Sequence, residues 1–301
     1  MTDFAADRAS GSADVALGFL AALERWSAID TSPAPAALRA ALLAFLRAAI
    51  AAQPSMALVH QLAARALAVA DAALARGASI AVLREELART AAAERTDLVA
   101  ARAGLARQAA GLIEENGAWL ATLSMSTAVR DAVLEAARRG RAPRVLVGEG
   151  RPGCEGRALA AALAAAGVPV WLVVDAALPL LISQARMVWI GADAVTDRGV
   201  INKVGSYAAA LAAREHSVPV YALAERRKLI PAATPALTIA EMPAAEVWDA
   251  PAAGVEPRNL YFELVPMPLL RGVAVEDTVL PPGEAAATAR ERALPGELAG
   301  R

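Results

Sequence analysis

The pattern of apolar residues changes at Gly117, and no other feature of the sequence constrains the fold as strongly. Before this point, apolar residues recur every three or four positions, which is typical of helices that bury one face. Glycine, proline and capping residues divide this pattern into four predicted helices: residues 14–28, 35–52, 55–76 and 79–114. We therefore expect residues 1–115 to form a helical bundle.

After Gly117, short apolar runs alternate with helical segments. The predicted strands are residues 118–123, 145–148, 168–174, 187–190 and 218–223, and the predicted helices are residues 127–139, 156–166 and 203–215. This alternation is typical of a parallel, doubly wound sheet. The sequence thus predicts an α/β fold, in which the N-terminal helical bundle is followed by a Rossmann-like parallel sheet domain, residues 116–301, that ends in a C-terminal tail.

Composition excludes several classes of protein. At 57% hydrophobic residues the chain can bury a large core, and a net charge of −1 argues against non-specific nucleic-acid binding. One cysteine and two histidines exclude a disulfide framework and make a metal site unexpected, and no glycine-rich nucleotide fingerprint is present, so we expect no cofactor. The longest apolar run, residues 158–174, is interrupted by Gly167 and Pro169. We therefore expect a cytoplasmic protein without a membrane span.

Lysine is rare in this chain. Only two of the 30 basic residues are lysines, Lys203 and Lys228, and all the others are arginines. Arginine does not replace lysine where a compact ammonium group is required. The two lysines are either chance survivors of an arginine-rich composition or functional residues.

Polar residues follow the predicted strands, where a doubly wound sheet binds its ligands. Ser126 and Thr127 open a predicted helix, so they are either ordinary N-caps or part of a phosphate site built on free backbone N–H groups. Glu149 and Arg151 follow the next strand and form either a surface ion pair or part of the same site.

Asp193, Asn202 and Lys203 form the most informative group. Asp193 ends a predicted strand, and the chain returns to the same edge of the sheet nine residues later at Asn202 and Lys203. A carboxylate, an amide and an ammonium group in one cavity suit a polyhydroxylated anion, because the first two bind hydroxyl groups and the third meets a phosphate.

Several ordered motifs in residues 117–266 resemble one superfamily, the initiation factor 2B alpha/beta/delta-like group. Its members include the regulatory subunits of eukaryotic initiation factor 2B, ribose-1,5-bisphosphate isomerase and methylthioribose-1-phosphate isomerase. The motifs lie in residues 122–129, 149–156, 191–195, 199–207, 218–228 and 258–266.

The resemblance implies a sugar-phosphate pocket. At matching positions it makes Asp193 the catalytic aspartate, Asn202 and Lys203 the sugar-binding pair, Lys228 a phosphate-side lysine, Ser126 and Thr127 phosphate-holding residues, and Glu149, Arg151 and Arg258 further substrate-binding residues. The implied ligand is a phosphorylated sugar or a nucleoside monophosphate. The resemblance also implies a homodimer formed mainly through the C-terminal half.

One departure concerns the chemistry. The isomerases carry a catalytic cysteine where this chain has Ser124, which takes the second catalytic position here. A serine hydroxyl needs a partner base to move a proton, and no base lies near it in the sequence. Cys154 is either a spatial substitute or a small packed residue. The isomerases' N-terminal Arg-Gly phosphate loop is also absent from the first 60 residues.

Two functions follow from these features. The first is a sugar-phosphate-binding protein of isomerase descent, whose chemistry is lost or rerouted; if it is an enzyme, it is an intramolecular oxidoreductase that interconverts aldose and ketose forms of a ribose 1-phosphate derivative. The second is a regulatory or assembly protein, like the initiation factor 2B subunits, that acts through protein contacts. The sequence favours the first.

Overall fold

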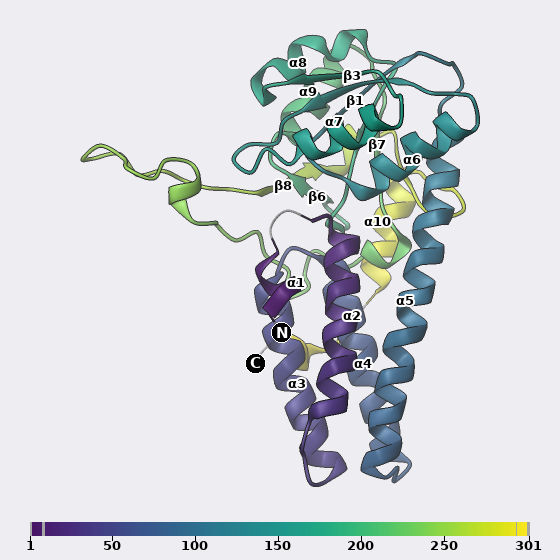
Figure 1. The fold of residues 1–301 in the computed structure, drawn as a ribbon, viewed down its shortest axis with the longest axis vertical. Helices are drawn as coiled ribbons and strands as arrows, with labels where there is room; N and C mark the ends of the chain where they lie inside the picture. Colours follow the sequence, from purple (N-terminus) through teal and green to yellow (C-terminus); the bar gives the residue numbers. More distant parts are fainter. Residues whose placement is uncertain (1, 8–9, 293, 300–301) are drawn as a thin grey trace.

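The computed structural model describes residues 2–7, 10–292 and 294–299. Four long helices lie side by side below a sheet domain (Figure 1). The helical part consists of α1 (Thr2–Ala6), α2 (Ser12–Ile29), α3 (Pro35–Ala52), α4 (Ala57–Ala75) and α5 (Ile80–Ala110). The predicted fold class, a helical bundle followed by a Rossmann-like sheet, is confirmed.

Leucine and alanine stripes hold the bundle together. On α3, Leu38, Leu42 and Leu46 are fully buried, and their four-residue spacing places them on one face of the helix. The helix begins at Pro35. Proline has no backbone N–H, and none is needed here because N–H groups in the first turn of a helix have no intrahelical partner. Each buried leucine contributes about 1.5–3 kcal/mol, so this stripe fixes α3 against its neighbours.

Two of the described helices, α3 and α4, are long and apolar enough to cross a membrane by length and composition. The core helices of a soluble bundle meet the same criteria, and the buried residues of α3 and α4 belong to the core of this bundle. The observation is therefore weak evidence for a membrane span.

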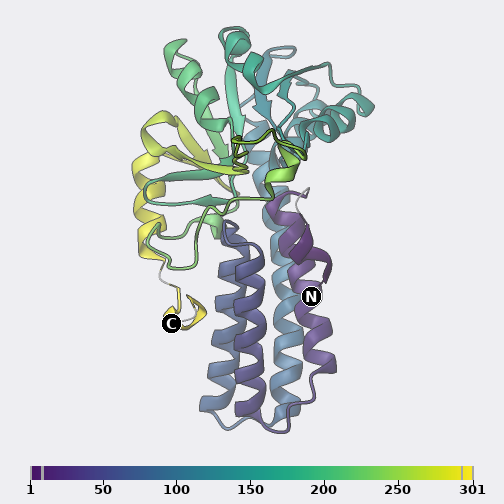
Figure 2. The same cartoon turned by 90° about the vertical axis from the view of Figure 1, so that its left-hand side faces the viewer.

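Helix α5 connects the two parts of the molecule. It is 31 residues long, and its first half contributes Leu83 and Leu87 to the bundle core. Its last turns contribute Leu105 and Ala109 to a different core, which lies under the sheet. The two parts thus share one continuous helix (Figure 2).

The main sheet has seven strands in the order β10-β9-β7-β4-β1-β2-β3. All neighbours are parallel except β9 and β10, which are antiparallel. The order reverses between β1 and β4, and this is the point where doubly wound sheets bind ligands. The strands are β1 (Trp119–Leu123), β2 (Arg144–Gly148), β3 (Val170–Val173), β4 (Met187–Ile190), β7 (Val220–Leu223), β9 (Gly272–Ala274) and β10 (Val279–Leu280).

Helices cover both faces of this sheet. One face packs on α6 (Thr127–Arg138), α7 (Gly156–Ala165) and the end of α5, whose buried residues share one core. The other face packs on α8 (Leu178–Leu181), α9 (Ser206–Glu215) and α10 (Pro282–Glu291). Burial on both faces explains why the strands are short, continuous apolar runs.

A second, antiparallel sheet differs from the sequence prediction. It contains β5 (Ala194–Val195), β6 (Gly199–Lys203) and β8 (Phe262–Pro266) in the order β5-β6-β8. The helix predicted at residues 203–215 therefore begins only at Ser206, because β6 pairs with β8 through Lys203 and Gly205 turns the chain at φ 101°. The β5–β6 hairpin returns the chain to the strand end that Asp193 occupies.

The middle of the segment between Lys228 and β8 extends away from the body of the protein, while its two ends, at Leu229 and Tyr261, are buried (Figure 1). It contains one short helical turn, η4 (Ala244–Glu246). The remaining single turns are η1 (Asp175–Ala177), η2 (Ile182–Gln184), η3 (Arg226–Lys228), η5 (Met267–Leu269) and η6 (Gly296–Ala299).

Candidate functional site

A polar cavity lies where the strand order of the main sheet reverses. The space inside it that a water-sized molecule can enter is about 70 Å³, and the cavity opens to solvent at its mouth. Residues after β1 and β4 form its floor, and the second sheet forms one wall. The start of α2 and the loop between α3 and α4 close it from the bundle side, so both parts of the molecule build it.

Ser124 follows β1 in a strained conformation. Its φ of 58° lies in the left-handed region, which residues with a side chain rarely adopt. Gly150 makes room for it, because a Cβ on Gly150 would lie 2.8 Å from the Ser124 Cβ and Oγ. In this position the Ser124 hydroxyl donates a hydrogen bond of 3.3 Å to Oε2 of Glu155.

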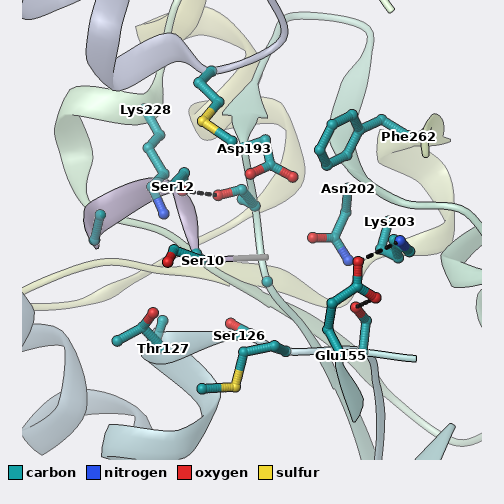
Figure 3. A pocket seen from close by; sticks show the side chains of 18 of the residues that line it. Ser10, Ser12, Ser126, Thr127, Glu155, Asp193, Asn202, Lys203, Lys228 and Phe262 are labelled. Carbon is teal, nitrogen blue, oxygen red and sulfur yellow. Dashed lines mark hydrogen bonds and ion pairs between the residues drawn. The ribbon is translucent and has the colours of Figure 1, made fainter. Parts of the chain in front are cut away.

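Glu155 and Lys203 form a buried ion pair in the wall of the cavity. Lys203 Nζ lies 2.9 Å from Glu155 Oε1, and the two side chains are 7% and 10% exposed. The ammonium group also lies 4.2 Å from the centre of the Tyr261 ring, which adds a cation–π contact. Gly153 leaves the space for the carboxylate, since a Cβ there would lie 2.5 Å from Glu155 Oε1. Figure 3 shows the Glu155 carboxylate beside Lys203 and Asn202.

Asp193 is buried and lines the same cavity. Burial raises the pKa of its carboxyl group from 3.8 to about 6, although the charges of Lys228 and Lys203 and a hydrogen bond from Ser12 oppose this shift. A carboxyl group with this pKa exchanges its proton near neutral pH, which suits general acid–base chemistry.

Lys228 forms a second buried ion pair, with Glu225. Its Nζ lies 2.7 Å from Glu225 Oε2, and the two side chains are 4% and 1% exposed. Both residues line the cavity, and Figure 3 shows Lys228 on the side opposite Lys203 and Glu155. The lysines therefore face the ligand space from two directions.

The start of α6 also faces the cavity, and both of its hydroxyls are engaged. Ser126 caps the helix, since its Oγ accepts a hydrogen bond of 3.3 Å from the Val129 N–H. The Thr127 hydroxyl donates to Oδ2 of Asp14 on α2, at 3.1 Å. Ser126 therefore both caps α6 and lines the cavity. The backbone N–H groups of the first turn favour an anion in front of them.

Asn202 is held by its neighbour on the next helix. Its Nδ2 donates to the Ser206 Oγ at 2.8 Å, and Ser206 in turn donates to the Lys203 carbonyl at 2.6 Å. The amide oxygen of Asn202 faces Gly191, where a Cβ would lie 3.2 Å away. Asn202 therefore presents an acceptor to the cavity next to Asp193.

Other residues that the sequence singled out lie away from the cavity. Glu149 pairs with Arg157 at 2.9 Å rather than with Arg151, whose backbone N–H donates to Asp175 at 2.7 Å. Arg258 lies on the extended segment and pairs with the exposed Glu241. Cys154 turns its Sγ to the Pro152 carbonyl, 3.7 Å away. None of these four residues is part of the cavity lining.

Sequence reasoning assigned no role to two of the cavity's charged residues, Glu155 and Glu225. Both follow strands of the sheet, Glu155 directly before α7 and Glu225 directly before η3, so the rule about strand ends covered them. Their partners give the more specific signal, because a buried lysine requires a carboxylate nearby. Among the described residues no cluster of three or more histidine, cysteine, aspartate or glutamate side chains is arranged to hold a metal.

Comparison with known proteins identifies the family of this chain. The model of the initiation factor 2 subunit family matches residues 8–282, which include both the bundle and the cavity. The chain belongs to the initiation factor 2 subunit family.

Relatives in this family carry different names. A translation initiation factor eIF-2B subunit 2-like protein of Pyrococcus furiosus is 34% identical over 171 residues, 56% of this chain and 60% of that protein. A methylthioribose-1-phosphate isomerase of Oleidesulfovibrio alaskensis is 36% identical over 58% of this chain and 52% of that protein. A ribose 1,5-bisphosphate isomerase of Archaeoglobus fulgidus is 32% identical over 59% of this chain and 58% of that protein. The family thus includes both sugar-phosphate isomerases and factor-like proteins.

One solved structure of the family matches nearly the whole chain. The translation initiation factor eIF-2B of Pyrococcus horikoshii superimposes with a TM-score of 0.78 at 25% identity, over 93% of this chain and 94% of that one. The matches to the three named relatives, by contrast, span only about half to three fifths of each relative's length.

Proposed function

We propose that the cavity binds a phosphorylated sugar of the ribose 1-phosphate type. The observation that carries this proposal is the convergence of Asp193, Lys203 and Lys228 on one cavity in front of a helix N-terminus. Ribose derivatives need hydrogen-bond partners for several hydroxyl groups and a cationic site for phosphate, and these groups supply both.

The charges divide the cavity into two ends. The first turn of α6 and Lys228 favour the phosphate group, because backbone N–H groups and an ammonium group stabilise an anion there. Asp193 and the Asn202 amide oxygen accept hydrogen bonds from sugar hydroxyls. The raised pKa of Asp193 lets it also donate a proton to a ring oxygen. This arrangement supports the isomerase-type ligand that the relatives' names suggest.

Three further statements belong to the proposal. The ligand is a phosphorylated sugar or, by the same chemistry, a nucleoside monophosphate. The protein is a cytoplasmic homodimer, with residues 1–115 and 116–301 as its two domains. An assembly function like that of the factor subunits is the alternative, and it rests on the names of relatives rather than on a contact in this chain.

Calorimetry with methylthioribose 1-phosphate, ribose 1,5-bisphosphate and AMP tests the proposal. We expect at least one of the three to bind the wild type. Lys203→Met and Lys228→Met should each weaken that binding about ten- to a hundredfold, because each removes a charge-assisted hydrogen bond. Circular dichroism at the calorimeter temperature checks that the variants are folded.

A matched control is Arg89→Met, which removes a basic residue from the surface of the bundle. We expect it to bind like the wild type. Absence of binding by the wild type for all three compounds would contradict the proposal, and so would unchanged affinity in both lysine variants.

A further inference from the structure

Ser124 lacks a base in the sequence, but the fold supplies one. The Glu155 carboxylate lies 31 positions further along the chain, and its Oε2 accepts the Ser124 hydroxyl at 3.3 Å. Its other oxygen, Oε1, is held by Lys203 at 2.9 Å. The carboxylate therefore has a fixed orientation, and it lines the ligand cavity together with Asp193.

Two glycines indicate that this arrangement is built around the pair. A Cβ on Gly150 would collide with Ser124 at 2.8 Å, and a Cβ on Gly153 would collide with Glu155 Oε1 at 2.5 Å. The φ of Ser124 is also strained, and the surrounding structure has to offset this strain. Strain of this kind, next to a buried ion pair in a cavity, is typical of a site where side-chain position matters for chemistry.

We propose that Glu155 is the base that moves the proton between C2 and C1 of the bound sugar, and that Ser124 is a positioning residue for it. This inference rests on the proposed function, because it requires a ribose 1-phosphate derivative in the cavity. It assigns to Glu155 the proton transfer that the cysteine performs in the isomerases, so the chemistry is rerouted rather than lost.

The reaction balances without an external oxidant or reductant. Protonated Asp193 gives its proton to the ring oxygen as the bond from that oxygen to C1 breaks. Glu155 Oε2 takes the proton from C2, and the electron pair of the C2–H bond forms a double bond between C1 and C2. Glu155, whose bound proton exchanges with solvent through the cavity mouth, then gives a proton to C1, while the C2 hydroxyl gives its proton to Asp193 and becomes the ketone. C2 is oxidised, C1 is reduced, and both carboxyl groups return to their starting states.

A carboxylate is a suitable base for this step. It abstracts a proton next to a developing carbonyl in well-known sugar-phosphate isomerisations, and its contribution is typically 10²- to 10⁴-fold in rate. Lys203 balances the charge of Glu155, so the carboxylate stays buried in the cavity wall without leaving an unpaired charge.

The experiment follows conversion of methylthioribose 1-phosphate and ribose 1,5-bisphosphate in D₂O by NMR, with binding measured separately by calorimetry. We expect the wild type to convert at least one of them and to place deuterium at C1 of the product. Glu155→Gln should bind the same compound within about tenfold but lose conversion and deuterium incorporation by 10²- to 10⁴-fold. Ser124→Ala should lower kcat by about tenfold or less and leave KM nearly unchanged, because one neutral hydrogen bond is lost.

A second variant guards against loss of folding in Glu155→Gln. Gly153→Ala retains every charged group but pushes the carboxylate end of Glu155, which is the movable part of the contact. It should lower conversion while leaving the melting temperature and the ligand affinity nearly unchanged. Gly283→Ala, where a Cβ meets nothing within 4 Å, is the matched glycine control and should convert like the wild type.

The outcomes separate this inference from the proposed function. If the wild type binds neither compound, the role of Glu155 is overturned, and if it does not bind AMP either, the proposed function is wrong as well. If it binds but does not convert, or converts without deuterium at C1, the proposed ligand site stands and the role of Glu155 is overturned. Conversion at the wild-type rate by Glu155→Gln would overturn it as well.

Discussion

The bundle and the sheet domain bury polar side chains in different ways. In the bundle these side chains donate to backbone carbonyls: Ser27 to Glu24, Gln53 to Phe4 and His60 to Pro54, at 2.9 to 3.1 Å. At the strand ends of the sheet, buried charges instead pair with each other, as in Lys203–Glu155 and Lys228–Glu225. The bundle uses its polar groups to fix the chain, whereas the sheet keeps charged atoms next to a cavity.

The two regions meet in one network beside that cavity. Arg102 on α5 donates to Asp14 on α2 and to Asp131 on α6, at 2.9 Å each. Asp14 also accepts from Thr127 at the start of α6. The bundle thus positions the helix that faces the ligand, although its own core contains no charged residue of the site.

The largest difference in stability between variants of the two regions should follow from breaking one ion pair in each. Lys228→Met leaves Glu225 buried without a partner, which we expect to destabilise the protein by about 3–5 kcal/mol. Arg89→Met breaks an exposed pair with Glu85 on α5 and should change stability by about 0.5 kcal/mol or less. Urea denaturation of both variants measures the difference, and equal destabilisation would contradict the distinction between the two regions.

A core substitution separates stability from binding. Leu42→Ala empties a fully buried position on α3 and should cost about 2–5 kcal/mol. Because Leu42 itself does not line the cavity, the folded fraction of this variant should bind sugar phosphate with wild-type affinity. Denaturation and calorimetry on the same preparation test this, and a tenfold loss of affinity would show that the core acts on the site.

The two regions should also respond to pH in opposite directions. Burial raises the pKa of Asp193 from 3.8 to about 6, so the folded protein binds this proton more tightly and stability falls as the pH rises from about 4 to 6. Burial lowers the pKa of His60 from 6.5 to about 4, so stability falls as the pH drops from about 6.5 to 4. Each effect is worth about 3 kcal/mol, and in the wild type they oppose each other.

Replacing either His60 or Asp193 should reveal the pH dependence of stability that the other residue causes. Relative to the wild type, His60→Gln should lose stability as the pH rises from 4 to 6, because only the Asp193 effect remains. Asp193→Asn should gain stability over the same range. Urea midpoints at pH 4, 5 and 6 measure both slopes, and parallel curves for the two variants would show that the groups do not titrate as described.

The smallest effect concerns a residue that the sequence associated with the site. Arg258 lies on the extended segment and pairs with an exposed glutamate, so Arg258→Ala should change sugar-phosphate affinity by about twofold or less. Calorimetry beside Lys203→Met makes the comparison direct. A loss as large as that of the lysine variant would mean that the extended segment closes on the ligand.

The strand-end rule predicts that several of the residues lining the cavity lie together. The rule covers Ser126 and Asp193, because they follow β1 and β4 at the same edge of the main sheet. Lys203 instead ends β6 of the second sheet, which brings it to the same cavity. The rule does not specify in which direction the side chains of a loop point. Arg151 and Glu155 both follow β2, so the rule cannot tell which of them faces the cavity. The direction of the Glu155 side chain depends on the space at Gly153.

The second sheet was beyond the reach of local patterns. Strand β5 has two residues, and β6 pairs with β8 about 60 positions away, so neither has a strong periodic signal. Pairing over that distance depends on the whole fold. For the same reason the base next to Ser124 could not be seen in the sequence, since Glu155 approaches it only once β1 and β2 are side by side.

A crystal structure of the protein soaked with ribose 1,5-bisphosphate or methylthioribose 1-phosphate tests the central claim most directly. The account predicts ligand density in the cavity at the β1–β4 switch, with the sugar between Asp193 and Lys203 and a phosphate at the first turn of α6 near Lys228. An empty cavity at saturating ligand, or density bound elsewhere on the protein, would contradict it.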